Sequence, residues 1–410
     1  MSSRRPRWGW FLLLPVLIGF LVGLTAANYR FALIAPGGND FLARWVGARA
    51  WVVEGRNPYD PSVSRTAQQM IYGRPADRAR GEDAAHFVYP LPAMLFFAPF
   101  GPLPYPLARA IWMTLLEISL PALVLLGMRL ARWRPGPWTL ASTMLFSVLG
   151  YHGFRAIVVG QFAVIGALLL VGALACIQSR RDVAAGLLLA LSMARPQMTF
   201  LLVPFVIVWA ARARRPWLLA STVGFSALLL AVSLAVMPEW PLLWLRQVVD
   251  DPAFTAWGSP LSIAVVGLGR APLGLALALS GLLLIYTLWE WVQAGGESDR
   301  RFQWAAQLTL VVTVWIGPWA ITPNFVVLLP ALCLVFGIAA ARLGRRSGVV
   351  VIATLSGLGL GLWALFLLTV EGNVESGWMH FPLPLLALAG LWWVRWWARQ
   401  DTITAALGEG

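Results

Sequence analysis

The carboxylate of Asp40 is a group in this chain that could do acid–base chemistry. It lies in the stretch GGNDFLARW, directly before residues 41–54, whose apolar side chains recur at helical spacing on one face. One interpretation is that Asp40 is the N-cap of that helix and satisfies its free amides. The other is that Asp40 is a general base whose pKa is set by burial and by nearby arginines. The spacing allows both interpretations.

The rest of the chain is composed for a lipid environment. Of its 410 residues, 59% are hydrophobic and 12% are charged, whereas soluble domains contain about 25% charged residues. Runs without any charge reach the length of about 20 residues that a helix needs to cross a bilayer. These observations predict an all-α polytopic membrane protein. The charge-free runs include 8–29, 216–238, 271–289, 302–341 and 347–370.

The positive charge follows this membrane pattern. All 31 basic residues are arginines and the net charge is +13, but the arginines occur in short clusters between the apolar runs. Such clusters are typical of cytoplasmic loops, so we expect a multi-pass plasma membrane protein with both termini in the cytoplasm, and no nucleic-acid partner. The absence of lysine is typical of a GC-rich bacterial genome.

If every arginine cluster is cytoplasmic, the chain crosses the membrane with about 12 helices. Residues 1–398 then form a single membrane domain, followed by a short cytoplasmic tail, 399–410. The external loops, 30–87 and 237–258, hold most of the acids, prolines and aromatic residues, so we expect the chemistry on the outer face.

Two parts of this domain are predicted to depart from simple spanning helices. Residues 41–54 are expected to form an external helix in the membrane interface, with Arg44 and Arg49 reaching toward headgroups. Segments 88–104 and 259–270 are predicted to be re-entrant, the first because five prolines interrupt it.

The sequence contains no Walker motif, dinucleotide fingerprint or cluster of metal ligands. We therefore expect no cofactor; a divalent cation is compatible with the sequence but not indicated by it.

Several short motifs carry a family resemblance. GRNPYD follows the predicted interfacial helix, and then come FVYPLPAMLFFAPFGPLP, GQFAVIGALLL, ARPQMTFLLVPF and TPNFVVLLPAL, in this order, over residues 35–335. Their order and topology resemble the GT-C membrane glycosyltransferases, and among them glycosyltransferase family 87, which uses polyprenyl-phosphate-mannose. The resemblance implies a GT-C-type helical bundle that binds a polyprenyl-phosphate sugar donor, a lipid-linked or glycan acceptor and membrane lipids.

The resemblance also implies site residues. In GT-C enzymes an acid at the start of the first external loop deprotonates the acceptor hydroxyl, and Asp40 occupies that place. The leaving phosphate must be met by positive charge or hydrogen-bond donors, and the sugar needs polar partners. The candidates for donor binding are Tyr89, His152, Arg155, Gln161, Arg195, Gln197 and Asn324.

Four of these candidates also have a simpler interpretation. Arg195 interrupts an apolar hairpin at its predicted outer turn, where it would either line a cavity or snorkel to the interface. His152 and Arg155, in GYHGFR, would contact phosphate or anchor another outer turn. Gln161 would contact the donor, cap a helix or join two helices. Some family members carry His where this chain has Pro323-Asn324.

The predicted function is inverting transfer of a sugar, with mannose favoured over a pentose such as arabinofuranose. The competing hypothesis is a transporter or flippase of lipid-linked or small substrates. That class predicts duplicated halves and charges deep within the bundle, neither of which is evident in this sequence.

Overall fold

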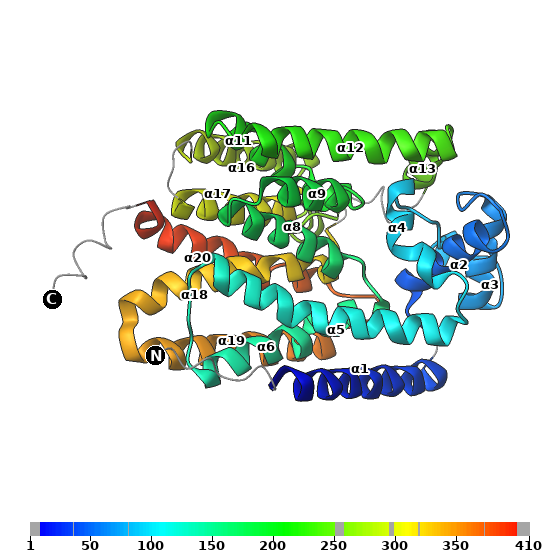
Figure 1. Ribbon diagram of the computed structural model, residues 1–410, viewed down its shortest axis with the longest axis horizontal. Helices are drawn as coiled ribbons and strands as arrows, with labels where there is room; N and C mark the ends of the chain where they lie inside the picture. The colour runs from blue at the N-terminus through cyan, green and yellow to red at the C-terminus, as the bar shows by residue number, and fades with distance from the viewer. Residues whose placement is uncertain are drawn as a thin grey trace.

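The computed structural model describes residues 9–35, 37–80, 82–250, 258–294, 299–318, 320–372 and 374–399. Within these ranges the chain is mainly helical and forms no strand (Figure 1). The all-α prediction is therefore confirmed. Residues 400–410 of the predicted tail lie outside the described part.

Seven helical segments of the described chain are long and apolar enough to cross a membrane. They lie in α1 (Gly9–Ile34), α5 (Tyr105–Leu130), α12 (Pro216–Val236), α16 (Leu273–Gln293), η5 with α18 (Thr322–Leu328 and Leu329–Leu343), α19 (Ser347–Thr369) and η7 with α20 (Gly377–His380 and Pro382–Arg399). An eighth span results if α6 (Pro137–Leu149) and α7 (Tyr151–Val159), which meet at 44°, cross together.

The expected count of about 12 spans is not confirmed, because several apolar segments fold as short helices. These are α8 (Ala163–Gln178), α9 (Asp182–Ser192) and α11 (Leu202–Arg212). An 11-residue helix is about 16 Å long, roughly half of a bilayer core. The sequence contained enough apolar residues for these spans, but prolines and turns divide them.

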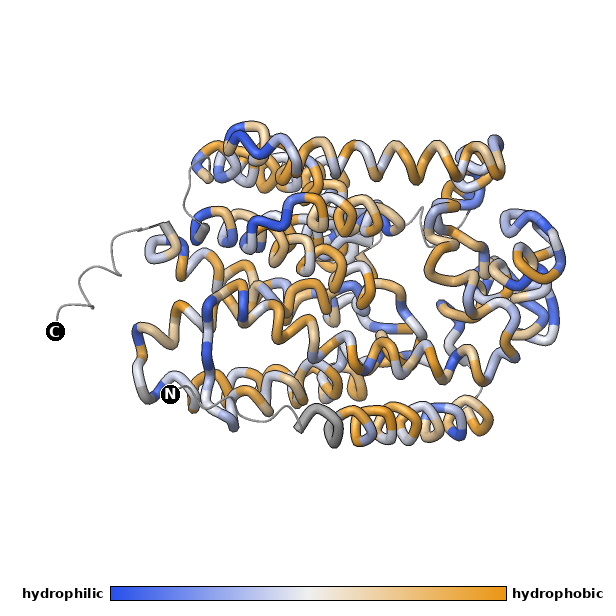
Figure 2. The backbone as a smooth tube through the Cα atoms, viewed as in Figure 1, coloured by the Kyte–Doolittle hydropathy of each residue, from blue (hydrophilic) through white to orange (hydrophobic). Residues whose placement is uncertain are grey.

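Two spans form the centre of the bundle. In an apolar 18-residue window of Thr322–Leu343, 78% of the residues are buried, and in the corresponding window of Tyr105–Leu130, 56%. The share is only 11% in α1 and α12, so these helices present apolar side chains outward, as a lipid-facing surface requires. Figure 1 shows α5 and α18 between α1 and α19 on one side and α8, α9 and α12 on the other, and Figure 2 shows apolar residues along most helices.

One end of the bundle is covered by α2 (Asn39–Val52), α3 (Pro61–Tyr72) and α4 (Met94–Phe97), whereas α1 begins and α20 ends toward the other end (Figure 1). Nine of the 14 residues of α2 are buried, including Arg44. The expectation that Arg44 reaches toward headgroups is therefore wrong: its side chain is buried, and its guanidinium lies over the ring of Tyr89, while α2 packs against α3 and α5.

Proline placement explains the irregular segments. Residues 91–100 form three short pieces, η2 (Leu91–Ala93), α4 and η3 (Ala98–Phe100), because each proline lacks a backbone donor. The expected loop 237–258 contains a helix, α13 (Trp240–Asp250), and 259–270 contains a helical turn and a π-helix. The predicted re-entrant course of 88–104 and 259–270 is not confirmed. The other elements are η1 (Arg78–Arg80), α10 (Pro196–Thr199), α13 (Trp240–Asp250), α15 (Pro260–Ser262), η4 (Ile263–Leu268), α17 (Asp299–Ile316) and η6 (Gly344–Arg346).

The structure places His152 and Arg155 within α7 rather than at the predicted outer turn, and the chain turns between α7 and α8. Gly160 ends α7 with a φ of 74°, and a Cβ added there would lie 2.5 Å from Cβ of Phe41. Glycine is thus needed for both the left-handed conformation and the close approach to α2. This approach places residue 161 beside the start of α2.

We expect Gly160→Ala to lower the free energy of unfolding by about 2 kcal/mol or more, because it adds backbone strain and overpacks Phe41. Thermal unfolding of the detergent-solubilised chain would measure the loss. The control is Gly224→Ala within α12, where an added Cβ meets nothing within 4 Å and stability should be unchanged or higher. Equal melting temperatures for the two variants would contradict the role of Gly160.

Candidate functional site

Asp40 lies in the first turn of α2 rather than at its N-cap. The N-cap is Gly38, with a φ of 73°, and no side chain caps the helix. The preceding turn is held by α5: Tyr105 donates its hydroxyl to the Gly37 carbonyl at 2.5 Å, and Arg109 donates to the Ala35 carbonyl at 2.5 Å. The N-cap interpretation is therefore wrong, and the carboxylate is available for other contacts.

The residue after Asp40 anchors the start of the helix. The ring of Phe41 stacks on Trp112 of α5 with centroids 5.0 Å apart and planes within 12°, and it meets Phe100 edge-on at 5.7 Å. Phe41 is completely buried. Because such aromatic packing fixes ring positions, the backbone of Asp40 is held against α5.

A chain of hydrogen bonds leads from Asp40 into the bundle. Gln161 donates from Nε2 to Oδ2 of Asp40 at 2.8 Å, and its Oε1 accepts from Nη1 of Arg195 at 2.6 Å. Arg195 also donates from Nη2 to Oδ1 of Asn324 at 2.6 Å and from Nη1 to the Tyr89 hydroxyl. Five of the eight residues predicted for the site therefore meet in one network.

Arg195 occupies the break between α9 and α10, where Pro196 starts the next helix. Its side chain is only 3% exposed, so it does not snorkel to the interface. Its guanidinium lies 5.7 Å from the centroid of the Tyr89 ring, and that of Arg44 lies 4.9 Å from the same centroid. Two buried cations thus share one aromatic ring.

A cavity of about 240 Å³ opens beside this network. Its lining includes Asp40 and Arg155, and also Glu375 and His380 from the segment between α19 and α20. The carboxylate of Glu375 pairs with Nε of Arg155 and accepts a hydrogen bond from the Thr322 hydroxyl. The cation that faces the cavity is therefore Arg155, whereas Arg195 lies behind Asp40 and Gln161.

Burial raises the pKa of the Asp40 carboxyl above its ordinary value. Arg44 opposes this effect most strongly; Asp83 raises the pKa further, whereas Arg195 and Arg155 lower it. Asp40 is only half-buried, so a ligand in the cavity can reach it. A carboxylate with a raised pKa is better matched to accepting a proton near neutral pH.

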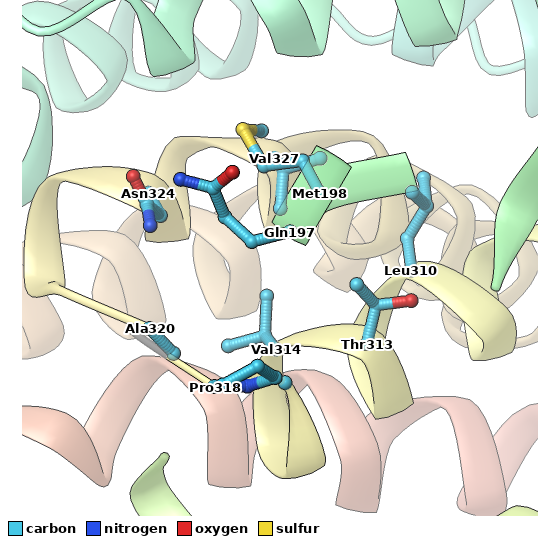
Figure 3. A pocket seen from close by; sticks show the side chains of 10 residues that line it. Gln197, Met198, Leu310, Thr313, Val314, Pro318, Ala320, Asn324 and Val327 are labelled. Carbon is cyan, nitrogen blue, oxygen red and sulfur yellow. The ribbon is translucent and has the colours of Figure 1, made fainter. Parts of the chain in front are cut away.

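Two of the predicted residues lie elsewhere. His152 is buried within α7, where its ring packs against Phe325 at 5.1 Å and lines a separate cavity of about 10 Å³. Gln197 lines another cavity of about 10 Å³, where Figure 3 shows its amide beside Asn324. Neither residue lines the cavity of Asp40.

Four residues at the site were not predicted from the sequence: Arg44, Thr322, Glu375 and His380. Arg44 was detectable, because it follows Asp40 by four residues on the predicted helix and therefore shares its face. Thr322 begins the motif TPNFVVLLPAL but carries no chemical signal of its own, and Glu375 and His380 lie outside the motifs.

This arrangement suits proton transfer coupled to anion binding. Asp40 can accept a proton from a hydroxyl in the cavity, while Arg155 can bind a negatively charged group beside it. Among the residues that the structure describes, no group of three or more His, Cys, Asp or Glu side chains could hold a metal ion.

The sequence model of glycosyltransferase family 87 matches residues 87–323, which is more than half of the chain. Tyr89, Arg155, Gln161 and Arg195 lie within the matched range, whereas Asp40 precedes it. Searches of curated proteins and of solved structures give no match.

The raised pKa of Asp40 predicts a stability effect. When the pKa of a carboxyl is higher in the folded state than its unfolded value of about 3.9, ionisation of that carboxyl above its folded pKa destabilises the fold. We therefore expect Asp40→Asn, whose amide oxygen can still accept from Gln161, to melt at a higher temperature than wild type at pH 7.5. Each unit of raised pKa corresponds to about 1.4 kcal/mol.

The difference should shrink as the pH falls through the raised pKa, because wild type then also becomes neutral at this position. Thermal unfolding of both proteins from pH 4 to pH 8 would measure it. A lower melting temperature for Asp40→Asn at pH 7.5 would mean that the carboxylate is a structural element.

Proposed function

We propose that this chain, which belongs to glycosyltransferase family 87, is an inverting glycosyltransferase that uses a polyprenyl-phosphate sugar. The sugar is mannose, and the acceptor is a lipid-linked or cell-envelope glycan. The reaction takes place at the outer face of a bacterial plasma membrane, with both termini in the cytoplasm. Family membership and the multi-pass helical bundle support this proposal.

In the proposed reaction Asp40 takes the proton from the acceptor hydroxyl. The hydroxyl oxygen then forms a bond to the anomeric carbon, and the bond between that carbon and the phosphate oxygen breaks. The electron pair leaves with the polyprenyl phosphate. Because attack comes from the side opposite the phosphate, the configuration at the anomeric carbon inverts.

The observation that carries the proposal is that one cavity is lined both by the carboxylate of Asp40 and by the guanidinium of Arg155. The first can hold the proton of the acceptor, and the second can bind the phosphate of the leaving group. At about 240 Å³ the cavity suits the polar head of the donor, and its polyprenyl tail would remain among the lipid-facing helices.

The remaining network residues act through Asp40. Gln161 orients the carboxylate, and Arg195 in turn holds Gln161, Asn324 and Tyr89. A positive charge buried behind the base also moderates the rise in its pKa. This role is different from the direct phosphate contact expected for Arg195 from the sequence.

We expect Asp40→Asn to lower kcat for transfer of labelled mannose from polyprenyl-phosphate-mannose by about 10²–10⁴-fold, because the acceptor loses its base. Purified protein would be assayed with a lipid extract from its own source as acceptor. The control is Glu54→Gln, which neutralises an exposed carboxylate just beyond the C-terminal end of α2 and should leave kcat unchanged.

Unchanged transfer by a folded Asp40→Asn would contradict the assignment of the base. If wild type transfers no mannose, a polyprenyl-phosphate pentose is supplied next, and transfer from it would identify a pentosyltransferase. Failure with both donors, together with uptake or flipping of a lipid-linked substrate in vesicles, would instead establish the transporter hypothesis.

Arg195→Gln should change the pH dependence of transfer. Since the charge of Arg195 lowers the pKa of Asp40, its removal should move the acidic limb of the kcat profile to higher pH and reduce kcat about 10–100-fold. The profile of wild type from pH 5 to pH 9 is the reference. A reduced kcat with an unmoved limb would indicate that Arg195 stabilises the fold only.

A further inference from the structure

Part of the cavity wall comes from the segment between α19 and α20, beyond the residues matched by family 87. Glu375 in this segment uses both carboxylate oxygens: one pairs with Nε of Arg155, and the other accepts from the hydroxyl of Thr322. Its side chain is 12% exposed, compared with 30% for Arg155. This is a partly desolvated ion pair rather than a solvated surface pair.

The geometry of the pair determines which part of Arg155 is free. The closest contact of Glu375 is with Nε of Arg155. The guanidinium has four further N–H donors on its terminal amino groups, and these can bind a ligand in the cavity. A long arginine side chain otherwise samples many rotamers and loses that freedom on binding. Because Glu375 holds the guanidinium of Arg155 in place before a ligand binds, less side-chain freedom is lost on binding.

Thr322 completes the support. It lies at the start of η5 and is 1% exposed. Through Glu375 it connects η5 to Arg155 on α7, two elements that also pack against each other. The carboxylate is therefore fixed by the buried part of the bundle even though its own segment lies near the surface.

We propose that Glu375 is a positioning residue of the cavity, which presents the terminal amino groups of Arg155 to the phosphate of a polyprenyl phosphate. The inference rests on the proposed function for the identity of the ligand. It adds a residue from the C-terminal part of the chain to the site, and it predicts that the effect of Glu375 on binding passes through Arg155.

The test measures binding of a sugar-free polyprenyl phosphate to the purified full-length chain in detergent, by calorimetry, with the corresponding polyprenol as a control for the tail. We expect Glu375→Gln and Arg155→Gln each to weaken binding of the phosphate by about tenfold, with polyprenol binding unchanged. The double variant should bind no more weakly than Arg155→Gln alone, because the two side chains act as one unit.

The matched control is Glu371→Gln, which neutralises an exposed carboxylate on the same segment and should bind like wild type. If Glu375→Gln does not fold, Thr322→Val removes one hydrogen bond to the carboxylate and should weaken binding by a smaller factor. Glu375→Asp, which keeps the charge, should recover part of the affinity.

Binding by Glu375→Gln equal to that by Glu371→Gln, or fully additive losses in the double variant, would overturn the inference. So would a wild-type chain that binds polyprenyl phosphate no better than polyprenol. Because the probe carries no sugar, wild-type binding without transfer of any sugar would refute the proposed function and leave the role of Glu375 standing.

Discussion

A single buried guanidinium, that of Arg195, connects the segments around the cavity. It donates to Gln161, Asn324 and Tyr89, which come from three separate parts of the chain. All three partners are neutral, and the carboxylate of Asp40 is one hydrogen bond further away. A buried charge costs several kcal/mol unless it is compensated, so the positions of Asp40 and of Arg195 depend on one another.

This dependence links the fold to the proposed chemistry. The raised pKa of Asp40 results from burial that Arg44, Arg195 and Arg155 only partly offset. If the arginines offset the effect of burial completely, the pKa of the carboxyl would be low and the carboxylate would be a weak base. If no cations lay nearby, burial would keep the carboxyl protonated. The arginines therefore moderate the rise in the pKa of Asp40, and they add positive charge beside the proposed position of the leaving phosphate.

The family match and the cavity do not cover the same residues. Residues 87–323 contain Arg155, Gln161 and Arg195, while Asp40 lies before this range and Glu375 after it. The matched part thus holds the network together, and the flanking parts complete the cavity wall. Gly160 is one of the contacts that join them, since its lack of a side chain allows the turn before Gln161 to approach Phe41.

The sequence by itself determined the class of the protein, since lipid-length apolar runs and arginine clusters are local properties of the chain. It also identified Asp40 and most members of its network through short motifs. It could not determine the number of spans, because prolines and turns divide apolar segments such as 182–211 into short helices. Nor could it show whether Asp40 caps a helix, or whether Arg195 snorkels to the interface or is buried. Those distinctions depend on contacts between residues far apart in the sequence. Asp40 and Gln161 are separated by 121 positions, and Arg195 and Asn324 by 129 positions. Only the tertiary structure brings such residues together, because burial and charge compensation are properties of the packed chain.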